Sequence, residues 1–425
     1  MSRVMTSRER LQVTLDHSQP DRVCVDVGGT FNTGMHAATV SALRRAILGE
    51  SEYRVKVLHP IQFNGEIDGA LRRALSADVA AVMGNTIAFD IRNEDWKPWQ
   101  LFDGTPVLVP GAFNPTVDAK GDLLMYPRGD SRLSASARMP RGGFYFDPIV
   151  RQQPIDEDRL DPADNCQEFV VLNDEEVTDF ADRAERLATA TECGVIGLLP
   201  GVWSFGDLFY APAALADPRG IRDPEEWYVS LLTRPDYIHA VFERQTEIAL
   251  ENIHRLATAV GPHIQVVRLC SMEFGTQEGL FISPRTYREL FRPYYRRINT
   301  AIHTQTTWKT YKHSCGSVYD LIPDLIEDGF DILNPVQTSA AKMDARALKR
   351  EFGAHLVFWG GGVDTQTTLP FGTPDDVYRE VRERIDIFND GGGYVFAAIH
   401  NIQPNVPVPN LLALFKAVTD SWVGA

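Results

Sequence analysis

The residues of this chain best suited to chemistry are His313 and Cys315, two positions apart at the end of a stretch that predicts a β-strand. Side chains at positions i and i+2 of a strand lie on the same face, so the imidazole and the thiol point the same way. Imidazole nitrogen and thiolate sulfur are ligands that zinc prefers. Gly316 follows directly and lets the backbone turn into a helix that we expect to begin near Ser317.

Two ligands do not complete a zinc site, because catalytic zinc usually has three protein ligands and one open position. The pair also has a simpler interpretation, in which His313 is a hydrogen-bonded histidine inside a barrel and Cys315 is a small buried residue. The metal hypothesis therefore requires a third ligand from elsewhere in the chain.

The elements that must position this pair follow a regular pattern in the second half of the chain. Short apolar runs alternate there with helical patterns, which is typical of parallel βα units. The predicted strands are IQVVRLC from Ile264, TWKTYKHS from Thr307, FDILNPV from Phe330, LVFWGG from Leu356 and GGGYVFAAI from Gly391. Predicted helices begin at Ser283, Asp344 and Thr373, residue types that cap helix N-termini.

The first half supplies three further strands, which are VCVDVGG from Val23, DVAAVMG from Asp78 and VIGLLPG from Val195. Eight parallel strands with helices between most of them predict an α/β fold, a (β/α)8 TIM barrel, in which residues 1–425 form one domain. Residues 101–165 are rich in proline and glycine, contain a predicted hairpin around VDAKGDLLMY, and lie after the second strand. We interpret them as an insertion that forms a lid or wall of the active site.

In such a barrel the C-terminal ends of the strands face the active site. The residues that end or follow the predicted strands are Asp26, Asn85, Trp203, Glu273, His313, Cys315, Asn334, Gln337, Asp364 and His400. His400 returns to the same rim as His313 and Cys315, so it is the third metal ligand, a general acid or a histidine that only forms hydrogen bonds with the rim. Glu273 is a fourth ligand, a proton shuttle or a solvated carboxylate. The candidates for substrate binding are Asp26, Asn85, Trp203, Asn334, Gln337 and Asp364, each of which can instead fasten a rim loop.

The composition excludes several classes of partner. The net charge of −15 disfavours nucleic acid and anionic membranes, because both favour clustered lysine and arginine. No run of about 18 apolar residues predicts a membrane span, and the N-terminus lacks the apolar run of a signal peptide. The five cysteines are odd in number and scattered, which predicts free thiols and a cytoplasmic protein.

Four stretches of the chain resemble the uroporphyrinogen decarboxylase superfamily, and within it the branch of cobalamin-dependent methyltransferases. They are RERLQVTLDHSQPDRVCVDVGG, HSCGSVYDLIPDLIEDGFDILNPVQ, GGGVDTQTTLPFGTPDDV and GGGYVFAAIHNIQPNVPVPNLLAL. The resemblance implies a barrel enzyme that moves methyl groups to or from a corrinoid, with zinc held by a His-x-Cys pair and a distant Cys. His313 and Cys315 match the pair, whereas His400 stands where those enzymes have Cys.

The resemblance implies a methyltransferase that acts between a corrinoid and an O-, N- or S-methyl compound, or a thiol or folate acceptor. Zinc serves either direction, because it stabilises a leaving group and also lowers the pKa of a bound thiol. The sequence contains no Asp-x-His-x-x-Gly string of the kind that binds cobalamin, so a separate corrinoid protein is the expected partner. A homodimer is a further expectation.

Two other classes of function are open. A metal-free decarboxylase or lyase would use His400 and a carboxylate such as Asp26 as proton donors, and a non-catalytic relative would bind a partner through its lid. The string VDVGGTFNTGMH after the first predicted strand contains no arginine or lysine. A substrate with many carboxylates needs fixed positive charge, so porphyrinogen is not expected to be the substrate.

Overall fold

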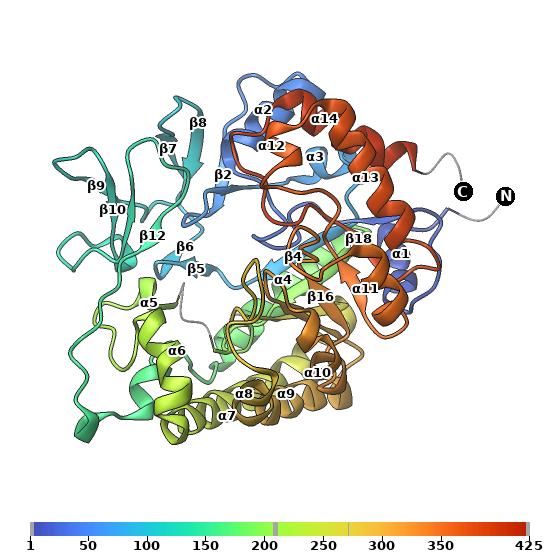
Figure 1. Ribbon diagram of the computed structural model, residues 1–425. Coiled ribbons are helices and arrows are strands. Elements are labelled where there is room, and N and C mark those ends of the chain that lie inside the picture. The colour runs from blue at the N-terminus through green and yellow to red at the C-terminus, as the bar shows by residue number, and fades with distance from the viewer. Residues whose placement is uncertain (1–3, 207–210, 271, 422–425) are drawn as a thin grey trace.

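The computed structural model describes residues 4–206, 211–270 and 272–421. Its centre is an eight-stranded parallel sheet that curves into a nearly closed barrel (Figure 1). In the order of the sheet, the strands are β1 (Cys24–Val25), β18 (Tyr394–Phe396), β17 (Val357–Trp359), β16 (Ile332–Asn334), β15 (Lys309–His313), β14 (Val266–Cys270), β13 (Gly194–Leu198) and β4 (Val79–Met83). Each strand overlaps a stretch that the sequence predicted, so the (β/α)8 TIM barrel is confirmed.

The two edge strands, β1 and β4, are joined through Asp78. Its backbone N–H donates to the carbonyl oxygen of Val25 at 2.7 Å, and its carboxylate accepts from the Val25 N–H at 2.9 Å. The same carboxylate is fully buried and accepts hydrogen bonds from Arg10 at 2.6 Å, Arg22 at 2.7 Å and Ser7 at 2.7 Å. One charged residue therefore links the end of β1 to the start of β4.

Alternate residues of the barrel strands point into the interior. Val266 of β14 and Tyr311 of β15 are fully buried in an apolar cluster inside the barrel. Because positions two apart on a strand share a face, Arg268 and His313 occupy the next inward positions toward the strands' C-terminal ends. The strand period thus places an arginine and a histidine above an apolar floor.

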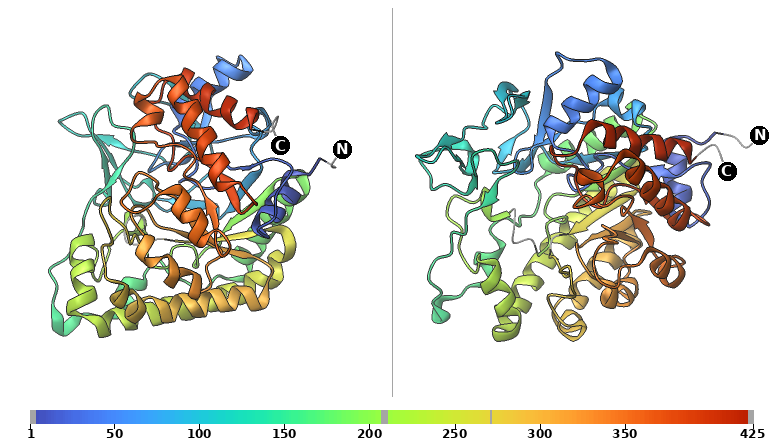
Figure 2. Two further views of the ribbon diagram at one scale, coloured as in Figure 1. Left: turned by 45° about the vertical axis from the view of Figure 1, so that its right-hand side comes forward. Right: turned by 45° about the horizontal axis from the view of Figure 1, so that its top comes forward.

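Helices surround the sheet, and α7 and α9 pack side by side beneath it in the view of Figure 1 and in both views of Figure 2. The α-helices are α1 (Ser7–Leu15), α2 (Ala37–Leu48), α3 (Gly69–Ala74), α4 (Asp174–Ala190), α5 (Ala211–Ala214), α6 (Pro224–Thr233), α7 (Pro235–Val260), α8 (Pro284–Leu290), α9 (Arg292–Gln305), α10 (Ile322–Glu327), α11 (Ala345–Phe352), α12 (Thr368–Phe371), α13 (Pro374–Phe388) and α14 (Val408–Asp420). The 3-10 turns are η1 (Pro127–Gly129), η2 (Glu157–Arg159), η3 (Pro162–Cys166), η4 (Gly261–His263) and η5 (Tyr319–Leu321). Every helix in the described ranges is too short or too polar to span a lipid bilayer.

The predicted helix starts are confirmed at three positions. Ser283, Asp344 and Thr373 each precede the first residue of a helix, namely α8, α11 and α13. Each side chain accepts a hydrogen bond from the backbone N–H three residues later, which satisfies a donor that the helix leaves unpaired. Local sequence therefore sets where these helices begin.

The helix predicted to begin near Ser317 begins later, so that expectation is wrong. β15 ends at His313, and η5 precedes α10. The Ser317 hydroxyl donates to the carbonyl of Ala341 at 2.6 Å, and the N–H of Gly316 donates to Gln337 at 2.7 Å. Contacts with the loop after β16 hold this stretch in an open turn, which a helical start would break.

The chain between β4 and β13 builds small sheets beside the barrel (Figure 1). β5 (Thr86–Ala88) pairs with β6 (Ile91–Arg92), and a four-stranded sheet contains β12 (Asp147–Pro148), β11 (Ala137–Met139), β10 (Leu123–Met125) and β9 (Thr116–Val117). β9 and β10 pair antiparallel, as predicted for VDAKGDLLMY.

A further sheet takes strands from both sides of β4 in the sequence. Its order is β3 (Asn64–Gly65), β2 (Val55–His59), β8 (Pro106–Val109) and β7 (Lys97–Gln100). β2 precedes β4 along the chain, whereas its parallel partner β8 follows β4 and lies within residues 101–165. The predicted insertion, residues 101–165, therefore contains only one strand of this sheet, β8. The other three strands, β2, β3 and β7, lie before residue 101.

We expect His36, the N-cap of α2, to make stability depend on pH. Its Nδ1 accepts from the N–H of Ala38 at 3.2 Å, and its Nε2 is bonded to the carbonyl of Phe144 at 3.1 Å. Burial lowers the pKa of His36 from 6.5 to about 4, so the unfolded chain binds more protons between these values. Acidification from pH 7 to pH 5 should remove about 2 kcal/mol of free energy of unfolding through this group.

Urea denaturation of the wild type and His36→Gln at pH 7 and pH 5 measures this contribution. Glutamine keeps an acceptor and a donor but does not titrate, so the variant should lose less stability on acidification by that amount. Equal losses in the two proteins would assign the pH dependence to other groups.

Candidate functional site

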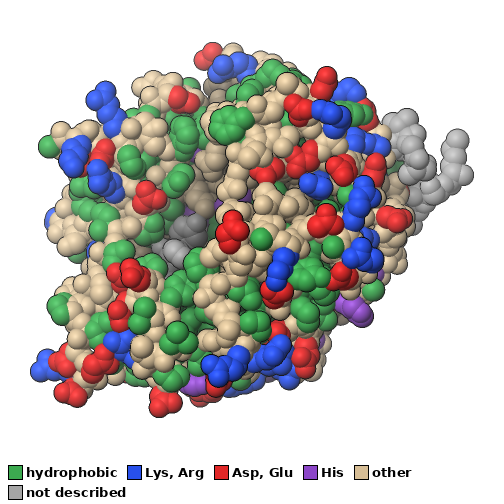
Figure 3. All heavy atoms as spheres, viewed as in Figure 1, with side chains coloured by type: hydrophobic (Ala, Val, Ile, Leu, Met, Phe, Trp, Pro, Cys, Tyr) green, Lys and Arg blue, Asp and Glu red, His purple; other side chains and the backbone are tan. Residues whose placement is uncertain are grey.

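A cavity of ≈ 510 Å³ opens at the C-terminal ends of the barrel strands. The described residues that line it are Phe31, Asn32, Ile61, Gln62, Tyr145, Phe146, Asp147, Pro148, Trp203, Arg268, Glu273, His313, Thr365, Gln366, His400, Asn401 and Gln403. Figure 3 shows the hollow in this face of the molecule. Residues 145–148 belong to the stretch predicted as a lid or wall, and they form one side of the cavity.

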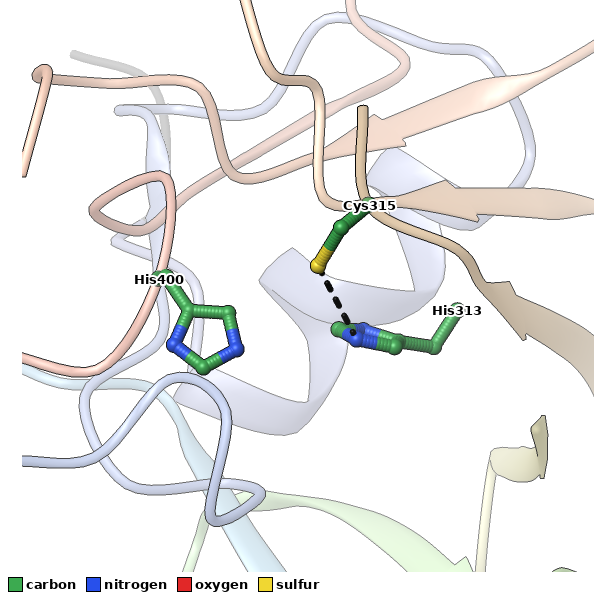
Figure 4. Close-up of side chains that lie close together, drawn as sticks. All are labelled: His313, Cys315 and His400. Atoms are coloured by element: carbon green, nitrogen blue, oxygen red, sulfur yellow. Dashed lines mark hydrogen bonds between the residues drawn. The ribbon is translucent and has the colours of Figure 1, made fainter. Parts of the chain in front are cut away.

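His313 and Cys315 point toward each other at the end of β15 (Figure 4). The Cys315 Sγ atom lies 3.6 Å from Nε2 of His313. Cys315 is two residues past the end of the strand and is not part of a disulfide. The i and i+2 spacing therefore brings the imidazole and the thiol together, although only the histidine belongs to the strand.

Asn334 of β16 fixes the ring of His313. The Asn334 Nδ2 group donates to the carbonyl of Trp359 at 2.9 Å, so its Oδ1 faces Nδ1 of His313 at 2.6 Å and accepts from it. This network assigns a proton to Nδ1 of His313 and leaves Nε2 facing Cys315 and Asn32. A histidine held in this way is prepared to bind a metal through Nε2.

His400 follows β18 and faces the other two side chains (Figure 4). Its Nδ1 lies 2.5 Å from Oδ1 of Asn401, and its Nε2 lies 3.1 Å from Nδ2 of Asn32. Burial, aided by the neighbouring His313, lowers the pKa of His400 to about 4. The ring is therefore neutral at pH 7, which is the form that binds metals.

The ligand atoms of His313, Cys315 and His400 all lie within 4.8 Å of one another. A tetrahedral zinc ion with ordinary bond lengths separates a nitrogen ligand from a sulfur ligand by about 3.5 Å. The 3.6 Å between His313 Nε2 and Cys315 Sγ matches that value. Two imidazoles and a thiolate make a suitable shell for zinc, so the donor set fits the ion, and the spacing of His313 and Cys315 matches it.

Glu273, which follows β14, contacts both His313 and Cys315. Its Oε2 accepts from the backbone N–H of Cys315 at 2.5 Å, and its Oε1 lies 3.4 Å from Nε2 of His313. Burial alone raises the pKa of Glu273, but the neighbouring His313 and the hydrogen bond from the Cys315 N–H lower it to about 2. The carboxylate therefore stays ionised beside the three candidate ligands.

Gln337 fastens the turn that carries Cys315. Its Oε1 accepts from the N–H of Gly316 at 2.7 Å. Gly316 has a φ of +82°, and a Cβ there would lie 2.5 Å from the carbonyl oxygen of Thr276, so only glycine fits. Of the two roles that we considered for Gln337, the described contact corresponds to fastening a rim loop.

Of the predicted site residues, Trp203, Glu273, His313 and His400 are among the described residues that line the cavity, whereas Cys315, Asn334, Gln337, Asp26, Asn85 and Asp364 are not. Asp26 accepts from the N–H of Gly29 at 2.7 Å and from the indole of Trp359 at 2.8 Å, and burial raises its pKa to about 6. Asp364 accepts from two backbone N–H groups at the start of α12. Asn85 is half-buried in the turn after β4. The structure thus does not bring Asp26, Asn85 or Asp364 to the cluster.

Arg268 and Asn32 are among the cavity residues that the sequence reasoning missed. Arg268 lies inside the apolar run IQVVRLC, and its guanidinium lies over the rings of Phe31 and Trp203, 4.6 Å and 5.5 Å from their centroids. The signal that could have identified it is an arginine at an inward position of a barrel strand, two residues after Val266. Arg268 also brings a positive charge into the cavity, whereas the string VDVGGTFNTGMH after the first strand contains no arginine or lysine.

Comparisons with known proteins agree with this architecture. A sequence model of the family described as uroporphyrinogen decarboxylase (URO-D) matches residues 139–421, well over half of the chain. A methylated-thiol–coenzyme M methyltransferase from Methanosarcina mazei is 25% identical over 226 residues, which are 53% of this chain and 54% of that protein. The chain therefore matches only about half the length of this curated relative.

A solved structure described as a methyltransferase from Methanosarcina mazei has the same fold. It superposes with a TM-score of 0.52 at 14% sequence identity, and the alignment covers 98% of this chain and 99% of that chain.

Proposed function

Because the chain belongs to the uroporphyrinogen decarboxylase family and is similar to a methyltransferase over half its length, we propose that it transfers methyl groups. The reaction connects a corrinoid with a small O-, N- or S-methyl compound, or with a thiol or folate acceptor, and uses zinc. The observation that carries this proposal is the convergence of His313, Cys315 and His400 at the cavity. The methyltransferases that the sequence resembles carry a His-x-Cys pair and a distant Cys. His313 and Cys315 match the pair, and His400 stands in the place of the distant Cys.

In this proposal, His313, Cys315 and His400 hold the zinc ion. Zinc supplies a Lewis acid for the methyl-bearing heteroatom, or lowers the pKa of an acceptor thiol. Asn334 holds the His313 ring with Nε2 toward the ion. Phe31 and Trp203 exclude water from the neighbouring part of the cavity, where they pack edge to face with centroids 5.9 Å apart.

Glu273 has a role in this site in addition to the three ligands. Its ionised carboxylate holds the N–H of Cys315 and lies 3.4 Å from the His313 ring, so it positions two ligands and balances positive charge. The same carboxylate is near enough to act as a fourth ligand or to carry a proton when substrate replaces it. His400 as a general acid is the alternative to its role as a ligand.

The corrinoid is proposed to arrive on a separate protein that docks at the cavity mouth. We place the reaction in the cytoplasm, because a reducing compartment keeps the Cys315 thiol available for zinc. Homodimer formation stays a prediction.

A metal-free decarboxylase or lyase is the second candidate function, and Arg268 favours it specifically. Its guanidinium lines the same cavity and suits a carboxylate substrate, which such an enzyme requires. In that case His400 donates the proton, and the cluster needs no metal.

Incubation of the purified protein with cob(I)alamin and a panel of O-, N- and S-methyl compounds tests the proposal. We expect the cob(I)alamin spectrum to change to that of methylcobalamin with at least one compound. No change across the panel, together with proton-dependent release of carbon dioxide from a carboxylate substrate, would support the lyase instead.

His400 variants separate the two candidates further. His400→Cys should keep zinc and part of the methyl-transfer rate, because thiolate binds zinc at about 2.3 Å against about 2.0 Å for imidazole. His400→Ala should lose zinc affinity. Loss of turnover in His400→Ala with unchanged zinc content would instead make His400 an acid–base residue.

A further inference from the structure

A second cavity, of ≈ 270 Å³, lies beside the one at the barrel rim. No described residue lines both cavities. In three chain segments, one residue lines the first cavity and its neighbour lines the second, namely Gln62 and Phe63, Tyr145 and Phe144, and Gln403 and Pro404. The two cavities are therefore adjacent but separate, and a ligand in the second lies outside the cluster of candidate metal ligands.

The side chains of Phe63, Trp99, Phe102 and Phe144 give the second cavity an aromatic lining. The fully buried ring of Phe113 packs edge to face against Trp99 with centroids 5.4 Å apart, and against Phe63 with centroids 5.8 Å apart. This packing fixes the orientation of both rings before any ligand binds. Phe102 and Phe144 are 45% and 40% exposed, so the aromatic lining continues from the interior to the surface.

Asp103 brings a negative charge to this lining, and the described residues of the lining include no lysine or arginine. Asp103 lies in the turn between β7 and β8, where its Oδ1 accepts from the backbone N–H of Thr105 at 2.9 Å. Burial lowers the pKa of His36 to about 4 although the charge of Asp103 acts to raise it, so the ring of His36 is neutral at pH 7. The potential in the second cavity is therefore negative, which favours a cation over an anion.

Hydrogen bonds within the chain already occupy the polar side chains beside these rings. His36 accepts from the N–H of Ala38 through Nδ1, and its Nε2 is bonded to the carbonyl of Phe144. The Nε2 group of Gln100 donates to the carbonyl of Gly104 at 3.2 Å. A quaternary ammonium group has no N–H, so it can enter such a lining without needing an acceptor.

We propose that the second cavity binds a small organic cation with a methylated ammonium head, among its aromatic rings and beside the carboxylate of Asp103. Aromatic rings attract cations through the negative charge of their faces, and quaternary ammonium groups are recognised in this way. The volume of ≈ 270 Å³ lies below the about 300–1,000 Å³ of sites for drug-sized ligands, so it suits a compound as small as choline. This binding does not depend on the proposed methyl transfer.

Isothermal titration of the full chain with choline and with 3,3-dimethylbutan-1-ol tests the cation site. The alcohol has the shape of choline, but a carbon atom replaces the nitrogen, so it carries no charge. Choline should bind about 10-fold or more tightly than the alcohol, a difference of about 1.4 kcal/mol. Equal affinities, or no binding of choline, would overturn the proposal.

Two variants separate the contribution of charge from that of the rings. Asp103→Asn should remove the preference for choline over the alcohol, because the amide keeps an acceptor for the Thr105 N–H but has no charge. Trp99→Leu should weaken choline binding more than binding of the alcohol, because leucine is apolar but has no ring face. Thermal denaturation checks that Trp99→Leu is folded, and Asp103→Asn tests the site if it is not.

Asp161→Asn is the matched control for Asp103→Asn. Oδ1 of Asp161 also accepts from the backbone N–H two residues later at 2.9 Å, and Asp161 is not among the described residues that line either cavity. This control should bind choline as the wild type does. Glu273→Gln removes a carboxylate charge from the first cavity and should also leave choline binding unchanged. Wild-type choline affinity in Asp103→Asn, or loss of choline binding in Glu273→Gln, would overturn the proposal.

Discussion

Wild-type protein is expected to purify with about one zinc ion per chain, and Cys315→Ser is expected to lose most of it. The serine hydroxyl stays protonated at neutral pH and is a poor zinc ligand, so two imidazoles alone remain. Loss of a residue that only orients a ligand lowers metal affinity 10–100-fold, so loss of a ligand should cost about 100-fold or more. Metal analysis after dialysis against a chelator of known affinity measures this change.

The control for this experiment is Cys166→Ser. Cys166 is buried in η3 and donates to the carbonyl of Val241, an interaction that serine reproduces. It should retain wild-type zinc content and activity. If Cys315→Ser and His313→Ala both bind zinc like the wild type, the three residues do not form a zinc site.

Asp78→Asn is expected to destabilise the fold by about 3–5 kcal/mol, the usual cost of breaking a buried ion pair. The Asp78 side chain is fully buried and accepts from the guanidinium groups of Arg10 and Arg22, and Arg10 is itself 3% exposed. An amide at this position removes the negative charge and also places N–H groups against the arginine donors. The free energy of unfolding from urea titration measures the loss.

Asp182→Asn is the matched control for this prediction. Asp182 is about half exposed and lies 3.9 Å from Arg186 on the surface of α4. A pair of this kind contributes about 0–1 kcal/mol, so the control should stay within that range. A similar small loss for Asp78→Asn would show that backbone pairing and apolar packing close the barrel without the charge.

The barrel was predictable because most of its strands are short apolar runs bounded by polar turns or glycine, whereas β15 (Lys309–His313) contains two lysines and was located by the regular alternation of strands and helices around it. Strands buried on both faces show this pattern directly in the sequence. The starts of α8, α11 and α13 were predictable for a different reason, since a capping side chain acts on N–H groups only three residues away. The turn after Cys315 was not predictable, because Gln337 and Ala341 in another loop decide its shape.

The cluster was predictable and the rest of the cavity was not, for reasons visible in single residues. His313, Cys315 and His400 occupy strand ends, and strand ends meet at one rim. Asp26 also ends a strand, yet its carboxylate is taken by a backbone N–H and the indole of Trp359. Asn32 lies in the loop after β1, and only the folded loop brings it to Arg268.

The sheet that contains β2, β3, β7 and β8 limits how this enzyme can be re-engineered. β8 is the central strand that joins β2, from before β4, to β7. Excising residues 101–165 would remove β8 and leave β2 and β7 with unpaired edges open to aggregation. A chimaera that exchanges the cavity wall with a relative must therefore transplant two separate segments, residues 55–65 and 97–165, as one unit.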